Sequence, residues 1–285
     1  GRIKMYSYEE VLDQIENGKM VNRGVEITLS GEIIRQKDFS WNASLLYAFN
    51  RNKVKHISVQ PSLWDSRISM PTSYPMVGKP LYGIYAYKWA GLNENGDPQV
   101  YDAENNVTSG PARDYHALVY CGTTVPIHNA SLTNVLRYKG FEFSAMLILD
   151  AGHKLRSSNI PSINMSNGRI TSTAKGIVDR WTQPGDVTDV PRLLFSNDTE
   201  NFNTHRTELY RYSDLFVYDA SNIRLSNISL AYRVPAHWCK KISLSGARLQ
   251  FNVENVATFA FDSKANYDLG GKVKPNYVWG LYLNF

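Results

Sequence analysis

The sequence predicts an all-β fold, an antiparallel transmembrane β-barrel, and the clearest sign is at the end of the chain. Residues 277–285 alternate in character, and one face of this segment carries Tyr277, Trp279, Leu281, Leu283 and Phe285. A soluble domain frays at its terminus and does not leave such an apolar edge unpaired. The last strand of a membrane barrel must instead pair with the first and turn an apolar face toward lipid.

Composition is compatible with this fold class. The mean hydropathy is −0.35 although 43% of the residues are hydrophobic, as expected when apolar and polar residues alternate. No run of about 18 apolar residues is present, so a transmembrane helix is not expected. The net charge of +5 is spread without a basic run, which argues against nucleic acid as a partner. Two cysteines, Cys121 and Cys239, exclude a disulfide scaffold.

Seven segments show the alternation, and most have the length of about nine to eleven residues that crosses a bilayer at a tilt. They are residues 21–34, 39–50, 131–138, 141–150, 222–233, 243–256 and 277–285. The side chains expected to face the membrane include Phe39, Trp41, Tyr47, Phe141, Phe143, Phe251, Trp279 and Phe285.

The fifth segment contains a break in the alternation. Ile223 and Leu225 are on the face opposite Ile228 and Leu230. A β-bulge near Asn227, or a membrane boundary there, explains the change.

The connections alternate between short and long, and this predicts an orientation. Short turns follow the first, third and fifth segments, and long links run over about 51–130, 151–221 and 257–276. Outer-membrane barrels keep short turns in the periplasm and long loops outside. Seven strands with a periplasmic C-terminus put the N-terminus outside the cell.

Residues 1–20 are therefore expected to form an extracellular loop with a short helix. Ser7 and Glu10 have the spacing of a capping box, and Gly18 would end the helix. Residues 21–285 are expected to form the barrel portion.

Several motifs together resemble a known family. In order along the chain they are NRGVEI (22–27), FSWN (39–42), NRNKV (50–54), YAYKWAGLN (85–93), GDP (96–98), RWTQPGD (180–186), YDASNIRL (218–225) and NVEN (252–255). Their order and spacing resemble the C-terminal part of SusC-like TonB-dependent transporters of Bacteroidetes, and the resemblance spans nearly the whole chain.

The resemblance implies a 22-stranded outer-membrane barrel filled by an N-terminal plug. This chain would be about the last seven strands, with no plug domain. Such proteins import oligosaccharides or peptides with a SusD-like surface lipoprotein as lid and TonB as the source of energy. The implied partners are the remaining N-terminal part of the same transporter, the SusD-like lipoprotein, TonB through that missing part, and membrane lipid or lipopolysaccharide. Because the chain opens on Gly1 without a Met, we expect a natural nick, a preparative cleavage product or an expressed fragment.

Motifs for catalysis or cofactor binding are not found. The six histidines lack metal-site spacing, and neither a GxSxG elbow nor a Walker loop is present. Residues 93–97 vaguely resemble a calcium loop, but an Asn-Gly turn is the better interpretation. We therefore expect no enzyme activity, no metal and no cofactor.

Binding by the long loops remains. Candidates for contact with substrate or lid are Trp64, Tyr82, Tyr85, Tyr87, Trp89, Trp181, Tyr210 and Tyr212. Aromatic rings stack on sugars and peptide side chains, but they also pack loops together or form a girdle at the membrane interface. The sequence leaves these three roles open.

Two other classes of protein are compatible with parts of the pattern. A soluble β-sandwich carbohydrate-binding module would also have short alternating strands with exposed aromatic residues. A glycan-active enzyme would need paired carboxylates, and nothing in the spacing of Asp186, Asp189, Glu200 and Glu208 selects such a pair.

Overall fold

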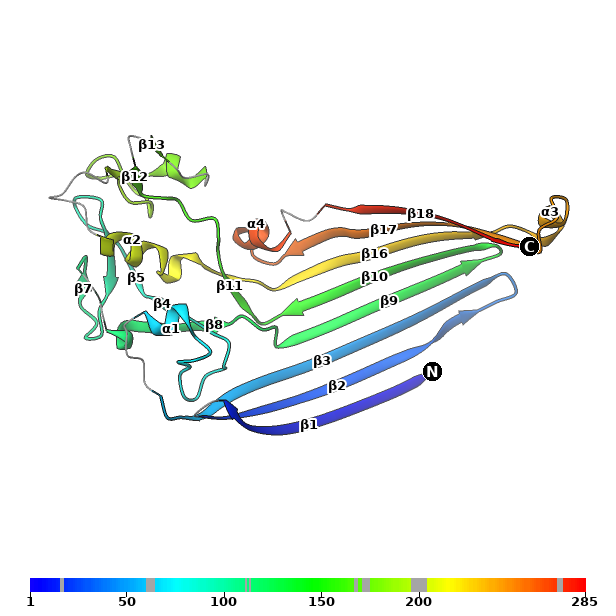
Figure 1. Ribbon diagram of the computed structural model, residues 1–285, viewed down its shortest axis with the longest axis horizontal. Helices are drawn as coiled ribbons and strands as arrows, with labels where there is room; N and C mark the ends of the chain where they lie inside the picture. The colour runs from blue at the N-terminus through cyan, green and yellow to red at the C-terminus, as the bar shows by residue number, and fades with distance from the viewer. Residues whose placement is uncertain are drawn as a thin grey trace.

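An antiparallel sheet of eight long strands is the main feature of the computed structural model (Figure 1). The structure describes residues 1–15, 18–59, 65–110, 112, 114–166, 169–170, 175–195, 204–270 and 274–285. The strands pair in chain order: β1 (Arg2–Ile15), β2 (Gly18–Arg35), β3 (Phe39–Ile57), β9 (His128–Tyr138), β10 (Phe141–Ala151), β16 (Asn222–Arg233), β17 (Gly246–Ala260) and β18 (Asn276–Asn284). This order is that of an up-and-down meander, whose outer members β1 and β18 are its two edges.

Shorter elements lie in the connections. Between β3 and β9 are α1 (Ser66–Ser69), β4 (Gly83–Tyr87), β5 (Trp89–Leu92), β6 (Pro98–Tyr101), β7 (Val107–Thr108), η1 (Tyr115–Ala117) and β8 (Leu118–Thr123). Between β10 and β16 are β11 (Lys154–Arg156), β12 (Asn164–Ser166), β13 (Arg169–Ile170), η2 (Lys175–Asp179), β14 (Leu194–Phe195), α2 (Thr204–Arg211), η3 (Asp214–Phe216) and β15 (Val217–Asp219). After β16 come α3 (Ala236–Lys240), η4 (Ser263–Ala265) and α4 (Asn266–Leu269). No helix within the described ranges is both long and apolar enough to span a membrane.

Three short connections lie at one end of the sheet, and the folded connections lie at the other (Figure 1). The links 36–38, 139–140 and the α3 segment join strands at one end, and the folded connections extend from the other. All seven sequence-predicted segments overlap strands of this sheet. The terminal strand β18 pairs with β17.

The predicted N-terminal helix is wrong. The segment forms β1, which pairs along β2 with Ile3 opposite Leu29 and Met5 opposite Ile27. The local capping pattern of Ser7 and Glu10 is overruled because an extended β1 gains a full ladder of cross-strand partners. With eight strands rather than seven, Gly1 lies toward the same end of the sheet as Phe285, not the opposite end (Figure 1).

The predicted bulge is confirmed. In the β16–β17 pair, Leu225 is opposite Ala257 while Asn227 is opposite Glu254, so the register shifts there. The β10–β16 pair shifts at the same place. The bulge turns Leu225 and Ile228 onto the same face of the sheet.

One face of the sheet is apolar across its full width, and we call it the apolar face. Because residues opposite each other in an antiparallel sheet share a face, the register defines rows of side chains. One row consists of Ile3, Leu29, Leu45, Leu132, Leu147 and Leu225. A second consists of Trp41, Leu136, Phe143, Leu230, Phe251 and Trp279.

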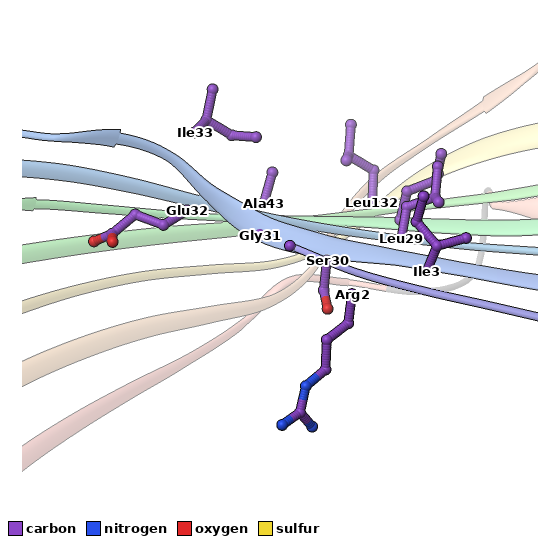
Figure 2. A pocket seen from close by; sticks show the side chains of 11 residues that line it. Arg2, Ile3, Leu29, Ser30, Gly31, Glu32, Ile33, Ala43 and Leu132 are labelled. Atoms are coloured by element: carbon purple, nitrogen blue, oxygen red, sulfur yellow. The ribbon is translucent and has the colours of Figure 1, made fainter.

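The opposite face, here the polar face, carries hydroxyls and charges. Arg2, Ser30, Ser44 and Thr133 form one of its rows. Figure 2 shows Ile3, Leu29 and Leu132 on one side of the sheet and Arg2 on the other. Near the start of β1, the small residues Gly31 and Ala43 leave an apolar hollow of about 490 Å³ (Figure 2).

The apolar face is uncovered. Phe143 is 36% exposed and Trp279 78%, and Phe285, which follows the end of β18, is 92% exposed. Its aromatic rings contact each other across strands, with ring centroids 4.2 Å apart for Phe251 and Trp279 and 4.5 Å for Phe141 and Tyr232. The register also puts the other predicted membrane-facing residues, Phe39, Trp41 and Tyr47, on this face.

Polar atoms on the two faces have internal partners. On the apolar face, the indole N–H of Trp41 donates to Oδ1 of Asn134 at 3.0 Å. On the polar face, Glu142 accepts from Arg137 at 2.8 Å and from Arg248 at 3.3 Å. An amide facing an apolar solvent must be paired in this way, because an unsatisfied polar group there costs several kcal/mol.

Candidate functional site

The two longest connections fold together at one end of the sheet, and we call the described parts of 58–127 and 152–221 the loop body. Its larger core contains Tyr85, Tyr87 and Val100 from the first connection and Leu209 of α2 from the second. The backbone N–H of Tyr87 donates to the carbonyl of Tyr212 at 2.9 Å. Both connections therefore contribute to one folded unit.

A buried ion cluster joins four segments of the loop body. Asp97 accepts from Arg206 at 2.9 Å and from Arg192 at 2.8 Å. Arg206, only 2% exposed, also donates to the carbonyls of Arg192 at 2.7 Å and Ile163 at 3.3 Å and to the side chain of Asn164 at 3.2 Å. A buried guanidinium with this many acceptors holds the segments in fixed relative positions.

The turn before Asp97 is an Asn-Gly turn, the interpretation that the sequence favoured. Oδ1 of Asn93 accepts the N–H groups of Asn95 and Asp97, each at 2.9 Å. Gly96 has φ +73°, and a Cβ there would lie 2.4 Å from the ring of Trp181. Both the positive φ and the lack of space for a Cβ require glycine at this position. Among the described residues, no group of three His, Cys, Asp or Glu could hold a metal ion.

Three of the predicted binding aromatics lie in the core of the loop body. Tyr85, Tyr87 and Tyr210 are each 1% exposed. The hydroxyl of Tyr85 accepts the N–H of Met76 at 2.9 Å, and that of Tyr87 donates to the carbonyl of Ala112 at 3.0 Å. Their surroundings match the packing role that the sequence left open.

The remaining candidates differ in exposure. Trp89 is half-buried, packs on Tyr210 with centroids 5.9 Å apart, and donates its indole N–H to Asp189 at 2.8 Å. Trp181 covers the Gly96 turn, and Tyr82 is 45% exposed. Trp64 is outside the described residues.

A cavity of about 490 Å³ lies between the segment after β11 and the C-terminal end of α2. Its lining combines cationic, hydroxyl and apolar side chains: Arg156, Ser157, Ser158, Ile160, Pro161, Ser162, Ile163, Thr207, Tyr210, Arg211 and Tyr212. Among the described residues, the lining has two arginines and no acidic side chain, so the cavity is suited to an anionic group.

Arg156 is held in place by the backbone around this cavity. It donates to the carbonyl of Tyr85 at 2.6 Å and to those of Arg211 and Ser213 at 3.4 Å, near the C-terminal end of α2. Burial lowers the pKa of Arg156. The guanidinium groups of Arg156 and Arg211 lie 5.7 and 5.9 Å from the ring centroid of Tyr212. Sequence reasoning identified Tyr210 and Tyr212 but missed both arginines, since no motif marks them.

The two cysteines are free. Cys121 lies in β8 of the loop body, and Cys239 is buried in α3 at the short-turn end. Burial raises the pKa of Cys121 to about 11, so its thiol is a poor nucleophile at neutral pH.

Comparison with curated proteins finds receptors from Formosa agariphila. TonB-dependent receptor P3 is 25% identical over 296 residues, which is 96% of this chain. TonB-dependent receptor P26 is 25% identical over 82% of the chain, and P39 is 21% identical over 90%. Over most of its length, the chain is homologous to TonB-dependent receptors. The predicted family resemblance is thereby confirmed.

The homologous region is only part of these receptors. The chain spans 28% of the length of P3 and P39 and 24% of P26. All three are named as receptors and none as an enzyme, in keeping with the sequence prediction. No family model matches the chain.

Solved structures share the fold. A chain of the RagAB peptide transporter superposes with a TM-score of 0.70 and 21% identity, covering 94% of this chain and 30% of that one. The RagAB peptide importer in the "open-open" state gives a TM-score of 0.65 at 20% identity, covering 99% and 32%. The eight-stranded sheet and loop body thus match part of a larger chain.

Proposed function

We propose that the chain forms part of the wall and outer loops of an outer-membrane, TonB-dependent importer of nutrients. The observation that carries the proposal is the uncovered apolar face, on which Trp279 is 78% exposed. In a soluble β-sandwich, that face would be buried against a second sheet. A membrane barrel leaves it for lipid and turns the polar face toward the lumen.

The edges of the sheet support a larger barrel. Strands β1 and β18 each present one unpaired row of backbone N–H and C=O groups. Such groups are not left open in hydrocarbon. The remaining N-terminal part of the same transporter would pair with both edges, complete a barrel of 22 strands and supply the plug.

The orientation follows from the connections. Short turns at the end near Gly1 and Phe285 face the periplasm, and the loop body lies outside the cell. The N-terminus of the chain is therefore periplasmic in this proposal, and residues 1–15 cross the membrane. TonB would act through the remaining part of the transporter.

The substrate class is peptides or oligosaccharides, and the structural match to the RagAB peptide importer favours peptides. The cationic cavity beside Tyr212 suits the carboxylate of a peptide, with Arg211 as its exposed contact. A SusD-like lipoprotein would cover the loop body, where Tyr82 and Trp181 offer aromatic contact surface.

The test is uptake by cells that produce the complete protein. We expect the protein in the outer-membrane fraction, and uptake of labelled oligopeptides or oligosaccharides that stops when the proton gradient is collapsed. Cells without the protein are the control. Recovery of the protein in the soluble fraction would instead support the carbohydrate-binding module, and uptake that persists without the gradient would exclude TonB-dependent import.

A further inference from the structure

The apolar face of β3 changes character once along its length. From Phe39 to Phe49 this face is formed by aromatic and apolar residues, and the next two positions on it are Arg51 and Lys53. Both cations are exposed. Because alternate residues of a strand share a face, these cations point the same way as the apolar residues before them.

The position of the change agrees with the thickness of a membrane. Ten residue steps from Phe39 to Phe49, at about 3.3 Å each, cover about 33 Å along the strand. Tilted by about 40°, this corresponds to a height of about 25 Å, which is that of the lipid-facing band of a barrel. Arg51 and Lys53 then lie just beyond the hydrocarbon, at the depth of lipid headgroups.

Aromatic residues mark the same boundary. The hydroxyl of Tyr47 is hydrogen-bonded to Nδ1 of His128 at 2.8 Å, and the ring of Phe49 lies 5.4 Å from that of His128. The three side chains share the apolar face immediately before the cations. Aromatic residues with a polar group are typical of a membrane–water interface.

The cations are placed close together. Arg23 of β2 is directly opposite Arg51 in the register. Arg51 and Lys53 are two residues apart on the same face of β3. Neither forms an ion pair with a carboxylate of the described residues, so both charges are available to an external anion.

We propose that Arg51 and Lys53 bind the phosphate groups of a membrane lipid in the leaflet on the side of the loop body. The inference rests on the proposed membrane location. A phosphate-bearing headgroup fits because its acyl chains would lie on the apolar residues of β3 below the cations.

The test compares lipid binding by three forms of the complete protein purified from the outer-membrane fraction. The test variant carries Arg51→Gln and Lys53→Gln. The control carries Lys37→Gln and Lys139→Gln, which remove the same charge at the short-turn end. Lipid A is titrated into each protein in a neutral detergent. We expect roughly thirtyfold weaker binding by the test variant and no change in the control, from about fivefold per cation.

Further arms identify the ligand. Dephosphorylated lipid A should bind weakly to all three proteins, and inorganic phosphate should not displace lipid A from the wild type. A variant with Arg51→Lys and Lys53→Arg should regain binding, which separates charge from folding.

Unchanged lipid A binding by the test variant would overturn the inference. Displacement by inorganic phosphate would do the same, since it would indicate a site for a soluble anion. If the test variant no longer associated with the surface lipoprotein but still bound lipid A, the two cations would belong to a protein interface. If no form reaches the outer membrane, the proposed function fails together with the inference; if all do and lipid binding is unaffected, only the inference fails.

Discussion

The sheet and the loop body are rich in the same aromatic residues but place them in opposite ways. In the sheet, Trp279 is 78% exposed and Leu281 62% exposed on the apolar face. In the loop body, Tyr85, Tyr87 and Tyr210 are each 1% exposed. The loop body is thus organised as a protein in water, with its rings inside, whereas the sheet has its rings where only an apolar solvent would accept them.

Charged residues show the complementary difference. The loop body buries Arg206 against Asp97, while the sheet keeps Glu142 and its two arginines on the polar face with about a third or more of each side chain exposed. A buried charge that loses its partner is costly, and an exposed ion pair contributes little. In the loop body, the most harmful substitutions should therefore be those that remove the partner of a buried charge. In the sheet, they should be those that place a charge on the apolar face.

The largest effect is expected from Asp97→Asn. The substitution leaves Arg192 and the buried Arg206 without their carboxylate, and breaking such a pair costs about 3–5 kcal/mol. We expect faster amide exchange throughout the loop body and unchanged exchange in the eight strands, measured by hydrogen–deuterium exchange on the complete protein.

The matched control is Asp102→Asn in the neighbouring turn. Asp102 accepts the N–H groups of Glu104 and Asn106 but makes no ion pair among the described residues, and an Asn oxygen can accept both bonds. It should leave exchange unchanged. Equal exchange in the two variants would mean that the Asp97 cluster does not hold the loop body together.

A smaller effect is expected from a charge on the apolar face. Leu147→Arg places a cation near the middle of β10, on the lipid side, at a cost of about 2–4 kcal/mol. Met146→Arg adds the same charge one residue away, on the polar face opposite Thr133, and should cost much less. Urea titration of the complete protein refolded into vesicles measures both. Equal losses of stability would contradict the assignment of the two faces.

The sheet could be predicted from the sequence because its signal is local. Where apolar and polar residues alternate along a strand, the sequence alone shows which side chains share a face. Even the bulge near Asn227 was visible, because the alternation changes phase between Leu225 and Ile228. The N-terminal strand was missed because Ser7 and Glu10 imitate a helix cap, and only pairing with β2 decides otherwise. That error propagated to the strand count and the position of Gly1.

The loop body could not be predicted in the same way, because its contacts join distant residues. Whether Tyr87 binds a ligand or fills a core depends on Leu209 and Tyr212, and no periodicity connects them. Arg206 and Arg156 were missed for the same reason. The Gly-Asp-Pro motif at 96–98 was the one available signal, and it pointed to the turn but not to the arginines around Asp97.

The smallest expected effect is a dependence on acid pH where the loop body meets the sheet. Burial by itself would raise the pKa of Asp219, but hydrogen bonds from Ser221 and the contact with Lys154, 3.0 Å away, lower it to about 2 from the usual 3.8. The ionised carboxylate therefore stabilises the β11–β15 pair above about pH 4, and this contribution is lost as the pH falls toward 2. Since Lys154 and Asp219 are 37% and 40% exposed, the contribution should stay below about 1 kcal/mol. Thermal unfolding of the complete protein, followed by near-UV circular dichroism, should show Asp219→Asn slightly less stable than wild type at pH 5 and equal to it at pH 2. When Lys154→Gln is already present, adding Asp219→Asn should lower the stability at pH 5 by less than it does in the wild type. A gap between wild type and Asp219→Asn that is the same at both pH values would assign its origin to packing instead of charge.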